Sequence, residues 1–133
     1  MDTDKDRRFD ALTEKIIGCA YKVHNGLGCG FLEKVYENAL AHDLRKAGLN
    51  VRQQIAVNVI YDGIVVGDYL ADLIVEGVVV IELKAIKGLD DIHSAQCINY
   101  LAATGLPICL LINFGRKVKF AASPVNRYSS NQI

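Results

Sequence analysis

The sequence predicts a single mixed α/β domain, and three patterns in it support that class. Apolar residues recur at spacings of three and four over residues 8–25 and 31–46, which is typical of amphipathic helices. Residues 51–85 carry alternating and continuous apolar runs separated by acid–glycine pairs at 62–63 and 76–77, which predicts three strands joined by hairpins. A further helical segment then precedes two more strand-like runs. The expected order of elements is ααβββαββ.

The length and composition favour one compact domain. We expect it to span residues 1–133, with a core over about 8–122 and a loose tail at 123–133. No apolar run approaches the ~20 residues that a membrane helix needs, and the charged N-terminus lacks the apolar core of a signal peptide. We therefore expect a cytoplasmic protein with no membrane partner. A hydrophobic content of 51% leaves room for a homo-oligomer that buries apolar surface between its subunits.

The charge is balanced, with 15 basic and 15 acidic residues and a formal net charge of zero. The chain therefore lacks the global positive charge that marks many nucleic-acid-binding domains. A nucleic-acid partner would have to be held by a local patch, such as Lys84 with Lys87 or the basic residues at 116–119, or by an oligomeric ring.

The four cysteines are Cys19, Cys29, Cys97 and Cys109, and none of them forms a CxxC pair. In a chain without a secretion signal this spacing favours small core hydrophobes over metal ligands.

Each element has its own signal along the chain. Three glycines in five residues end the first helix at 26–30, and Gly48 ends the second. The first strand alternates so regularly that its odd-numbered residues, 51 to 59, are expected on one face and its polar residues on the other. The remaining predicted elements are Ile64–Val75, Val78–Ala85, a helix from Asp90 or Asp91 to about Thr104, and strands Ile108–Phe114 and Val118–Ala122. Together they predict an antiparallel three-stranded meander, a crossover helix and a parallel return strand.

Charged residues interrupt the most apolar part of the chain, at residues 72–84. Asp72 precedes one buried run, and Glu82 and Lys84 end the next. A carboxylate rarely enters a buried strand unless it is paired or binds a cation, because desolvating a bare charge costs several kcal/mol. These three side chains therefore need a chemical reason.

The turn between the two runs decides whether these groups meet. A two-residue turn would place Asp72 opposite Ile81 and leave Glu82 on the other face. A three-residue loop at 76–78, with glycine in the left-handed position, would place Asp72 across from Glu82. We expect the longer loop, because only it gathers Asp72, Glu82 and Lys84 on one face. Two carboxylates beside an ammonium form a site suited to a hard cation and a water molecule.

Two helices offer further candidates. Glu33, Tyr36 and Glu37 share one face of the second helix, where Glu33 could equally serve as a first-turn acid that favours the helix dipole. Gln96 and Tyr100 share one side of the third helix.

The order of elements, with Asp72 on one strand and Glu82-x-Lys84 on the next, resembles the core of the PD-(D/E)XK nuclease superfamily. The sequence is most similar to the GxxExxY family within it, because residues 30–36 spell that motif and His24 and Gly28 precede it. Further matching motifs follow in order, at Ala71-Asp72-Leu73, Ile81-Glu82-Leu83-Lys84, Gln96-x-x-Asn99-Tyr100-Leu101 and Asn113-Phe114-Gly115. The resemblance covers roughly residues 12–122 and implies a restriction-endonuclease-like core.

The resemblance implies roles for individual residues. Asp72 and Glu82 would hold Mg²⁺ or Mn²⁺ with the main-chain carbonyl of Leu83, and Lys84 would orient or deprotonate the attacking water. Glu33 would be an additional metal or water contact on the helix.

Gln96 and Tyr100 would form the QxxxY pair that steadies the substrate strand. His24 and Tyr36, which belong to the family motif, are further candidates.

The function that follows is a Mg²⁺-dependent nuclease, with DNA a better candidate than RNA. The alternative is a catalytically silent nuclease-fold module that binds nucleic acid or a protein partner. A third interpretation is a structural Glu–Lys pair in a scaffold. The sequence leaves exonuclease and endonuclease action equally open.

Overall fold

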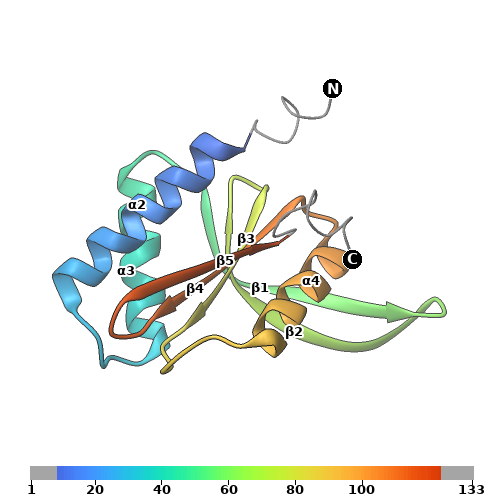
Figure 1. The fold of residues 1–133 in the computed structure, drawn as a ribbon. Coiled ribbons are helices and arrows are strands. Elements are labelled where there is room, and N and C mark those ends of the chain that lie inside the picture. Colours follow the sequence, from blue (N-terminus) through green and yellow to red (C-terminus); the bar gives the residue numbers. More distant parts are fainter. Residues whose placement is uncertain (1–8, 124–133) are drawn as a thin grey trace.

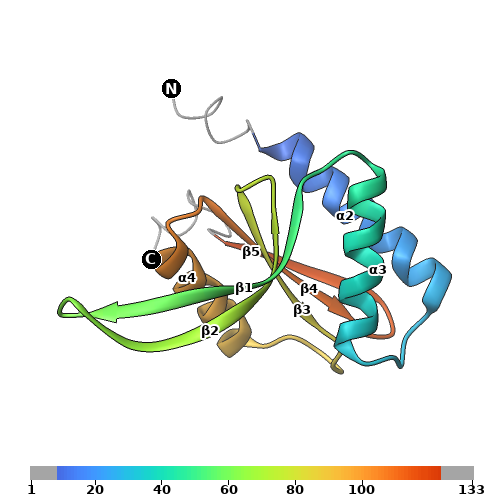
Figure 2. The ribbon, with the colours of Figure 1, turned by 180° about the vertical axis from the view of Figure 1, so that it is seen from behind.

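The computed structural model describes residues 9–123, which form a mixed sheet with helices on both faces. Helices α2 (Asp10–Leu27) and α3 (Glu33–Lys46) lie together on one side, and α4 (Asp91–Thr104) lies on the other (Figures 1 and 2). Residue 8, where the first helix was expected to begin, and residues 124–133 of the expected tail lie outside the described residues.

The sheet has five strands that lie side by side in chain order. The strands β3 and β4 are parallel and are connected through α4, whereas the other neighbouring pairs are antiparallel. The predicted order ααβββαββ, the meander, the crossover helix and the parallel return strand are confirmed. The strands are β1 (Val51–Tyr61), β2 (Ile64–Val75), β3 (Val79–Lys84), β4 (Ile108–Phe114) and β5 (Val118–Ser123).

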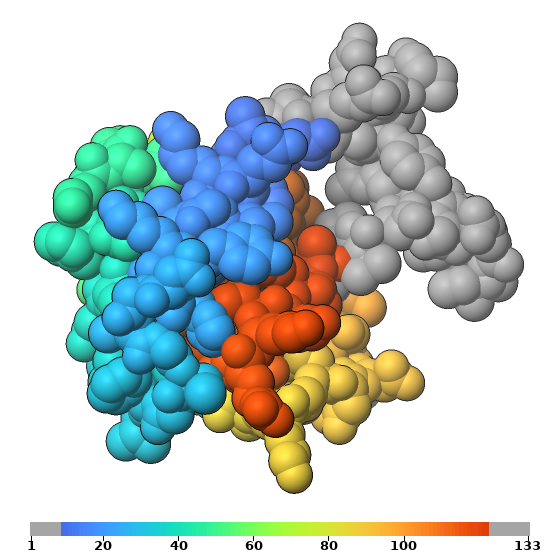
Figure 3. Space-filling view, turned by 60° about the vertical axis from the view of Figure 1, so that its left-hand side comes forward, coloured from blue at the N-terminus to red at the C-terminus, as the bar shows by residue number. Residues whose placement is uncertain are grey.

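Two apolar layers hold the helices to the sheet. The larger layer joins α2 and α3 to the sheet, and at its centre the ring of Tyr36 stacks on Phe114 with centroids 4.6 Å apart. At its border Tyr21 of α2 contacts Phe120 of β5 with centroids 5.4 Å apart, and the two elements lie side by side on the surface in Figure 3. The smaller layer joins α4 to the opposite face.

The strands β1 and β2 change faces partway along, which corrects the regular alternation predicted for β1. Val51 packs in the layer under α2 and α3, but Ile55 and Val57 pack in the layer under α4. Simple alternation would keep these odd-numbered residues on one face. Gln54 breaks it with a φ of 53°, a left-handed conformation that non-glycine residues seldom adopt. Opposite it, β2 changes faces between Leu73 and Ala71.

Beyond the change of face, β1 and β2 continue as a long curved hairpin whose tip projects away from the rest of the molecule (Figure 1, green). Its tip exposes apolar side chains, namely Ile60, Tyr61, Ile64, Val65 and Val66. This is surface that the predicted homo-oligomer would bury, and the oligomer itself stays a prediction.

Two cysteines correct the expectation that all four are simple core hydrophobes. Cys97 of α4 and Cys109 of β4 form a disulfide, with Cα atoms 5.7 Å apart. The smaller layer brings the helix close enough to the sheet for this geometry. Cys19 packs at the edge of the larger layer as expected, whereas Cys29 is exposed.

Within residues 9–123, no helix combines the length and the apolar character that crossing a membrane requires.

Candidate active site

The central hairpin opens at the end opposite its turn, and two carboxylates replace the missing main-chain acceptors. The ladder between β2 and β3 pairs Val75 with Val79 and ends at Leu73 and Ile81, so the predicted three-residue loop is confirmed. Past that point, the N–H of Asp72 donates to Glu82 Oε2 at 3.1 Å. The N–H of Leu83 donates to Asp72 Oδ2 at 2.8 Å. Each strand therefore supplies a carboxylate to the main chain of the other.

The two carboxylates are shielded from water to different degrees, because Glu82 is buried and Asp72 is partly exposed. Glu82 is 8% exposed. Burial, and then the negative charge of Asp72, raise the pKa of Glu82 to about 7. Burial also raises the pKa of Asp72, against the lowering effect of its hydrogen bonds from Leu83 and Gln54. Two adjacent acids that resist ionisation are stabilised in their charged form by a bound cation.

Lys84 is the basic residue closest in sequence to the carboxylates of Asp72 and Glu82. It lies two residues after Glu82 on β3 and is partly exposed. Its charge lowers the pKa values of both Asp72 and Glu82. The ammonium therefore acts electrostatically on both carboxylates, and its gathering with them into one catalytic site stays a prediction.

The segment after Lys84 is fixed by the motif Asn113-Phe114-Gly115. The side chain of Asn113 accepts from the N–H of Ile86 at 2.9 Å and donates to its carbonyl at 3.0 Å. A Cβ atom at Gly115 would lie 2.8 Å from the same carbonyl, so only glycine fits without a shift of the backbone. These contacts hold the end of β3, and with it Lys84, in place.

A third acid, Glu37, lies next to Asp72; the sequence placed it on the same helix face as Glu33 but gave it no role at the site. It is 3% exposed and forms an ion pair with Lys34 at 3.2 Å. The Nε2 of Gln54 donates to Glu37 at 2.7 Å and to Asp72 Oδ1 at 3.3 Å, so one amide links the two carboxylates. The Nε2 of Gln53 also donates to Glu37 at 2.7 Å. The unusual backbone of Gln54 is what turns consecutive glutamines toward the same acid.

Glu33 occupies the first turn of α3 and is exposed. It lines a small cavity of about 280 Å³ together with Lys34, Glu37, Gln54, Asp72 and Leu83. The structure therefore brings Glu33 to the same cavity as Asp72, although Glu37 is the acid with the buried contacts.

Tyr100 joins the site from α4. Its hydroxyl is hydrogen-bonded to Glu82, and burial together with that carboxylate raises the pKa of Tyr100. Gln96 lies one turn earlier on the same helix and is exposed. Both line a larger cavity on the α4 side of the sheet.

His24 and Tyr36 make structural contacts. The Nε2 of His24 lies 2.8 Å from the carbonyl of Gly115. The hydroxyl of Tyr36 donates to the carbonyl of Gly28 at 2.6 Å and accepts from the N–H of Phe31 at 3.2 Å. Tyr36 is fully buried, so it fixes the loop that precedes α3 and presents Glu33.

Comparison with known proteins identifies the family to which the chain belongs. A model of the PD-(D/E)XK nuclease superfamily matches residues 10–127. The chain belongs to this superfamily. No curated protein and no solved structure matches the chain. Membership agrees with the fold, because the mixed five-stranded sheet with its flanking helices is consistent with a restriction-endonuclease-like core.

Membership also bears on the two carboxylates, because PD-(D/E)XK nucleases generally use divalent metal ions. Across residues 9–123, no three His, Cys, Asp or Glu side chains lie close enough together to form a complete metal cage. Asp72 and Glu82 still fit a hard cation. Mg²⁺ is usually held by one or two carboxylates and keeps several of its waters.

The sequence analysis gave no role at the site to Glu37, Gln53 or Gln54. Glu37 had a usable signal, because it follows Glu33 by one helical turn and shares its face. For Gln53 and Gln54 the sequence signal was weaker, because it consisted only of two adjacent amides within a strand rich in β-branched residues.

Proposed function

We propose that the protein is a nuclease that uses Mg²⁺ or Mn²⁺ to hydrolyse phosphodiester bonds of DNA. The observation that carries this proposal is the open end of the β2–β3 hairpin, where Asp72 and Glu82 meet beside Lys84. Superfamily membership supports nuclease activity. We also assign the chain to the GxxExxY group, on the residues 30–36 that spell the motif.

The cation would be held by Asp72 and Glu82 with the carbonyl oxygen of Leu83. The donor set is chemically suitable because all three atoms are hard oxygens and because the repulsion between the two carboxylates would be relieved. When bound, the cation supplies charge neutralisation at the phosphate oxygens and favours hydroxide over water.

The chain's own residues would orient the reactants. Lys84 would position the attacking water or accept its proton. Gln54 would hold Asp72 in place through the amide that it shares with Glu37. Glu33 would contact the water or a second cation from the small cavity. Gln96 and Tyr100 would steady the substrate strand on the α4 side.

Cleavage of labelled DNA tests this proposal. Wild-type protein should cut single-stranded or duplex DNA with Mg²⁺ or Mn²⁺ and fail to cut it with EDTA. Asp72→Asn and Glu82→Gln should each abolish cleavage, because they remove a negative ligand while preserving shape. Asp68→Asn is the matched control, since Asp68 is exposed on the same strand β2 and should leave cleavage unchanged. Cleavage that survives in Glu82→Gln contradicts the proposal.

Thermal melting with Mn²⁺ separates the nuclease from a silent module. A cation that binds only the folded protein raises Tm. We expect the rise in wild type and in Asp68→Asn, and we expect its loss in Asp72→Asn. Nucleic-acid binding without cleavage, unaffected by Asp72→Asn, would instead support the alternative of a catalytically silent binding module.

A further inference from the structure

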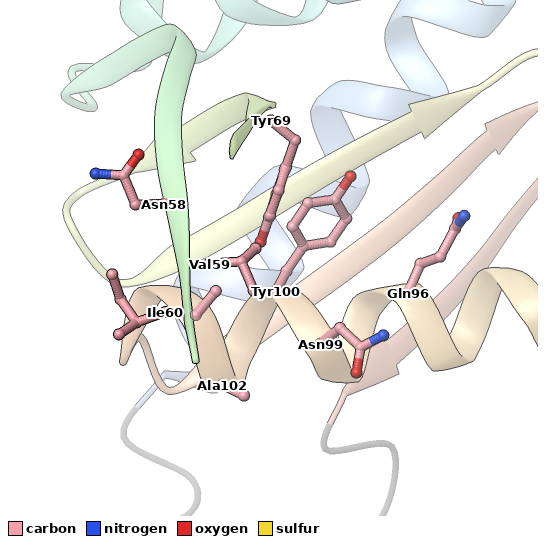
Figure 4. A pocket seen from close by; sticks show the side chains of 9 residues that line it. Asn58, Val59, Ile60, Tyr69, Gln96, Asn99, Tyr100 and Ala102 are labelled. Carbon is pink, nitrogen blue, oxygen red and sulfur yellow. The ribbon is translucent and has the colours of Figure 1, made fainter. Parts of the chain in front are cut away.

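The larger cavity is connected to Glu82 through Tyr100, and its lining has a different chemistry from that of the carboxylate pair. It has a volume of about 500 Å³ and lies between the β1–β2 hairpin and α4. That volume is within the range of small-molecule sites. Figure 4 shows the side chains that line it, among them Asn58, Tyr69, Gln96, Asn99, Tyr100 and Ala102.

The lining combines amides and aromatic rings and contains no charged side chain. Asn58, Gln96 and Asn99 each offer a donor and an acceptor, which is the pattern needed to pair with the edge of a nucleobase. Tyr69 and Tyr100 add ring surface, with centroids 4.4 Å apart. Unpaired bases in protein sites are held by this same combination of stacking and edge hydrogen bonds.

Tyr69 has an unused hydrogen-bonding group at this cavity. Its hydroxyl is buried and has no hydrogen-bond partner among the described residues. Burial, and then the charge of Glu82, raise the pKa of Tyr69 to about 12, so the hydroxyl keeps its proton. An unsatisfied buried hydroxyl in a native structure calls for an explanation, and a ligand that pairs with it is one.

Tyr100 is shared between the cavity and the carboxylate site. The ring of Tyr100 lines the cavity while its hydroxyl is hydrogen-bonded to Glu82. A base in the cavity would therefore belong to a nucleotide next to the phosphate held at Asp72 and Glu82.

The charge balance favours stacking over phosphate contacts. A formal net charge of zero leaves little general attraction for a polyanion. Proteins that bind single strands gain about 1–3 kcal/mol for each base stacked on an aromatic side chain. An unpaired base also reaches a pocket at the lowest cost, because no base pair has to be broken.

We infer that this cavity binds one unpaired nucleobase of a single-stranded substrate, beside the phosphate that is cut. The inference deepens the proposed function and rests on it for the position of the phosphate. It names single-stranded nucleic acid as the substrate class and Ala102, Asn99 and Tyr69 as residues that shape the base site.

Binding without cleavage tests the inference, so the assay is run with EDTA. The probes are a fluorescently labelled single-stranded DNA hexamer, an abasic hexamer with the same sugar–phosphate backbone, and a blunt DNA duplex. Ala102→Leu fills the cavity from its exposed rim. Ala95→Leu is the matched control, because Ala95 is exposed on the same helix and does not line the cavity.

We expect Ala102→Leu to weaken binding of the base-bearing hexamer about tenfold, the loss of one stacked base. Binding of the abasic hexamer and of the duplex should be unchanged, and Ala95→Leu should bind all three probes as wild type does. A melting curve checks that each variant is folded.

Two results would overturn the inference. One is wild-type affinity of folded Ala102→Leu for the hexamer, and the other is equal weakening of the hexamer and the abasic strand. This binding assay is independent of the cleavage assay described under the proposed function. A base-dependent effect of Ala102→Leu, in a protein that cuts no DNA in the cleavage assay, would refute the nuclease and leave the base site standing. Cleavage by wild type with no effect of Ala102→Leu on binding would refute the base site alone.

Discussion

The two ends of the β2–β3 hairpin are built from the same strands and serve opposite purposes. At the closed end, Val75 pairs with Val79 in a continuous apolar ladder, and both side chains are fully buried. At the open end the ladder stops, and Asp72 and Glu82 accept hydrogen bonds that main-chain carbonyls would otherwise accept. The closed end contributes stability through buried apolar side chains, whereas the open end holds charges that are costly to bury and that we propose bind a cation.

The largest effect should come from Lys84 at the open end. If it orients or activates the water, Lys84→Met should reduce cleavage by about 10²–10⁴-fold, the usual contribution of a positioned proton-transfer group. The rise in Tm with Mn²⁺ should persist, because both carboxylates remain. The measurement is the cleavage rate at saturating Mn²⁺.

Lys22→Met on the exposed surface of α2 is its control and should cut as wild type does. Loss of both cleavage and the Mn²⁺ effect in Lys84→Met would mean that Lys84 supports the site rather than the water.

The closed end could be predicted from the apolar pattern together with the expected pairing of Asp72 with Glu82. Alternating faces and the requirement that Asp72 meet Glu82 select the three-residue loop, because a one-residue shift moves every side chain to the other face. The order of elements followed for the same reason, since hydrophobic periodicity reports which face is buried.

Around the open end, the rest could not be predicted in this way. Gln54 adopts a left-handed φ that its residue type disfavours, so the change of face in β1 depends on tertiary contacts with Glu37 and Asp72. The disulfide between Cys97 and Cys109 depends on how closely α4 approaches the sheet, which spacing along the chain does not encode.

The pH dependence of stability should be the next largest effect, and it also reports on the open end. The folded-state pKa of Glu82, about 7, lies above its ordinary value of 4.5, and that of Asp72 is raised as well. The folded protein therefore holds more protons than the unfolded chain between these values, and stability falls as pH rises from 4.5 to 7. For Glu82 the fall is on the order of 3 kcal/mol in free energy of unfolding.

Urea unfolding with EDTA at pH 5 and pH 8 measures this change. Glu82→Gln should flatten the dependence, and Mn²⁺ should oppose it by favouring the ionised carboxylates. A wild-type protein that gains stability across this range would contradict the electrostatic picture of the site.

A smaller effect is expected at the closed end. Val79→Ala removes two methyl groups from a fully buried position and should cost about 2 kcal/mol in free energy of unfolding. The increase in Tm with Mn²⁺ should stay the same as in wild type, because the carboxylates lie at the other end of the hairpin. A smaller rise in Tm with Mn²⁺ in this variant would show that the two ends of the hairpin are coupled, and would contradict their separate roles.

The smallest effect concerns the turn itself. Glu76 has a φ of 56°, in the left-handed region where a side chain costs about 1–2 kcal/mol. Its carboxylate compensates by accepting from the N–H of Asn50, and its own N–H donates to the carbonyl of Asn50 at 2.8 Å.

Glu76→Gly removes the strain and the carboxylate together, so the free energy of unfolding should change by less than about 1 kcal/mol. Glu76→Ala keeps the strain and loses the bond, and should be less stable than Glu76→Gly by about 1 kcal/mol. Urea unfolding of the two variants measures the difference, and equal stabilities would mean that the turn is not strained at this residue.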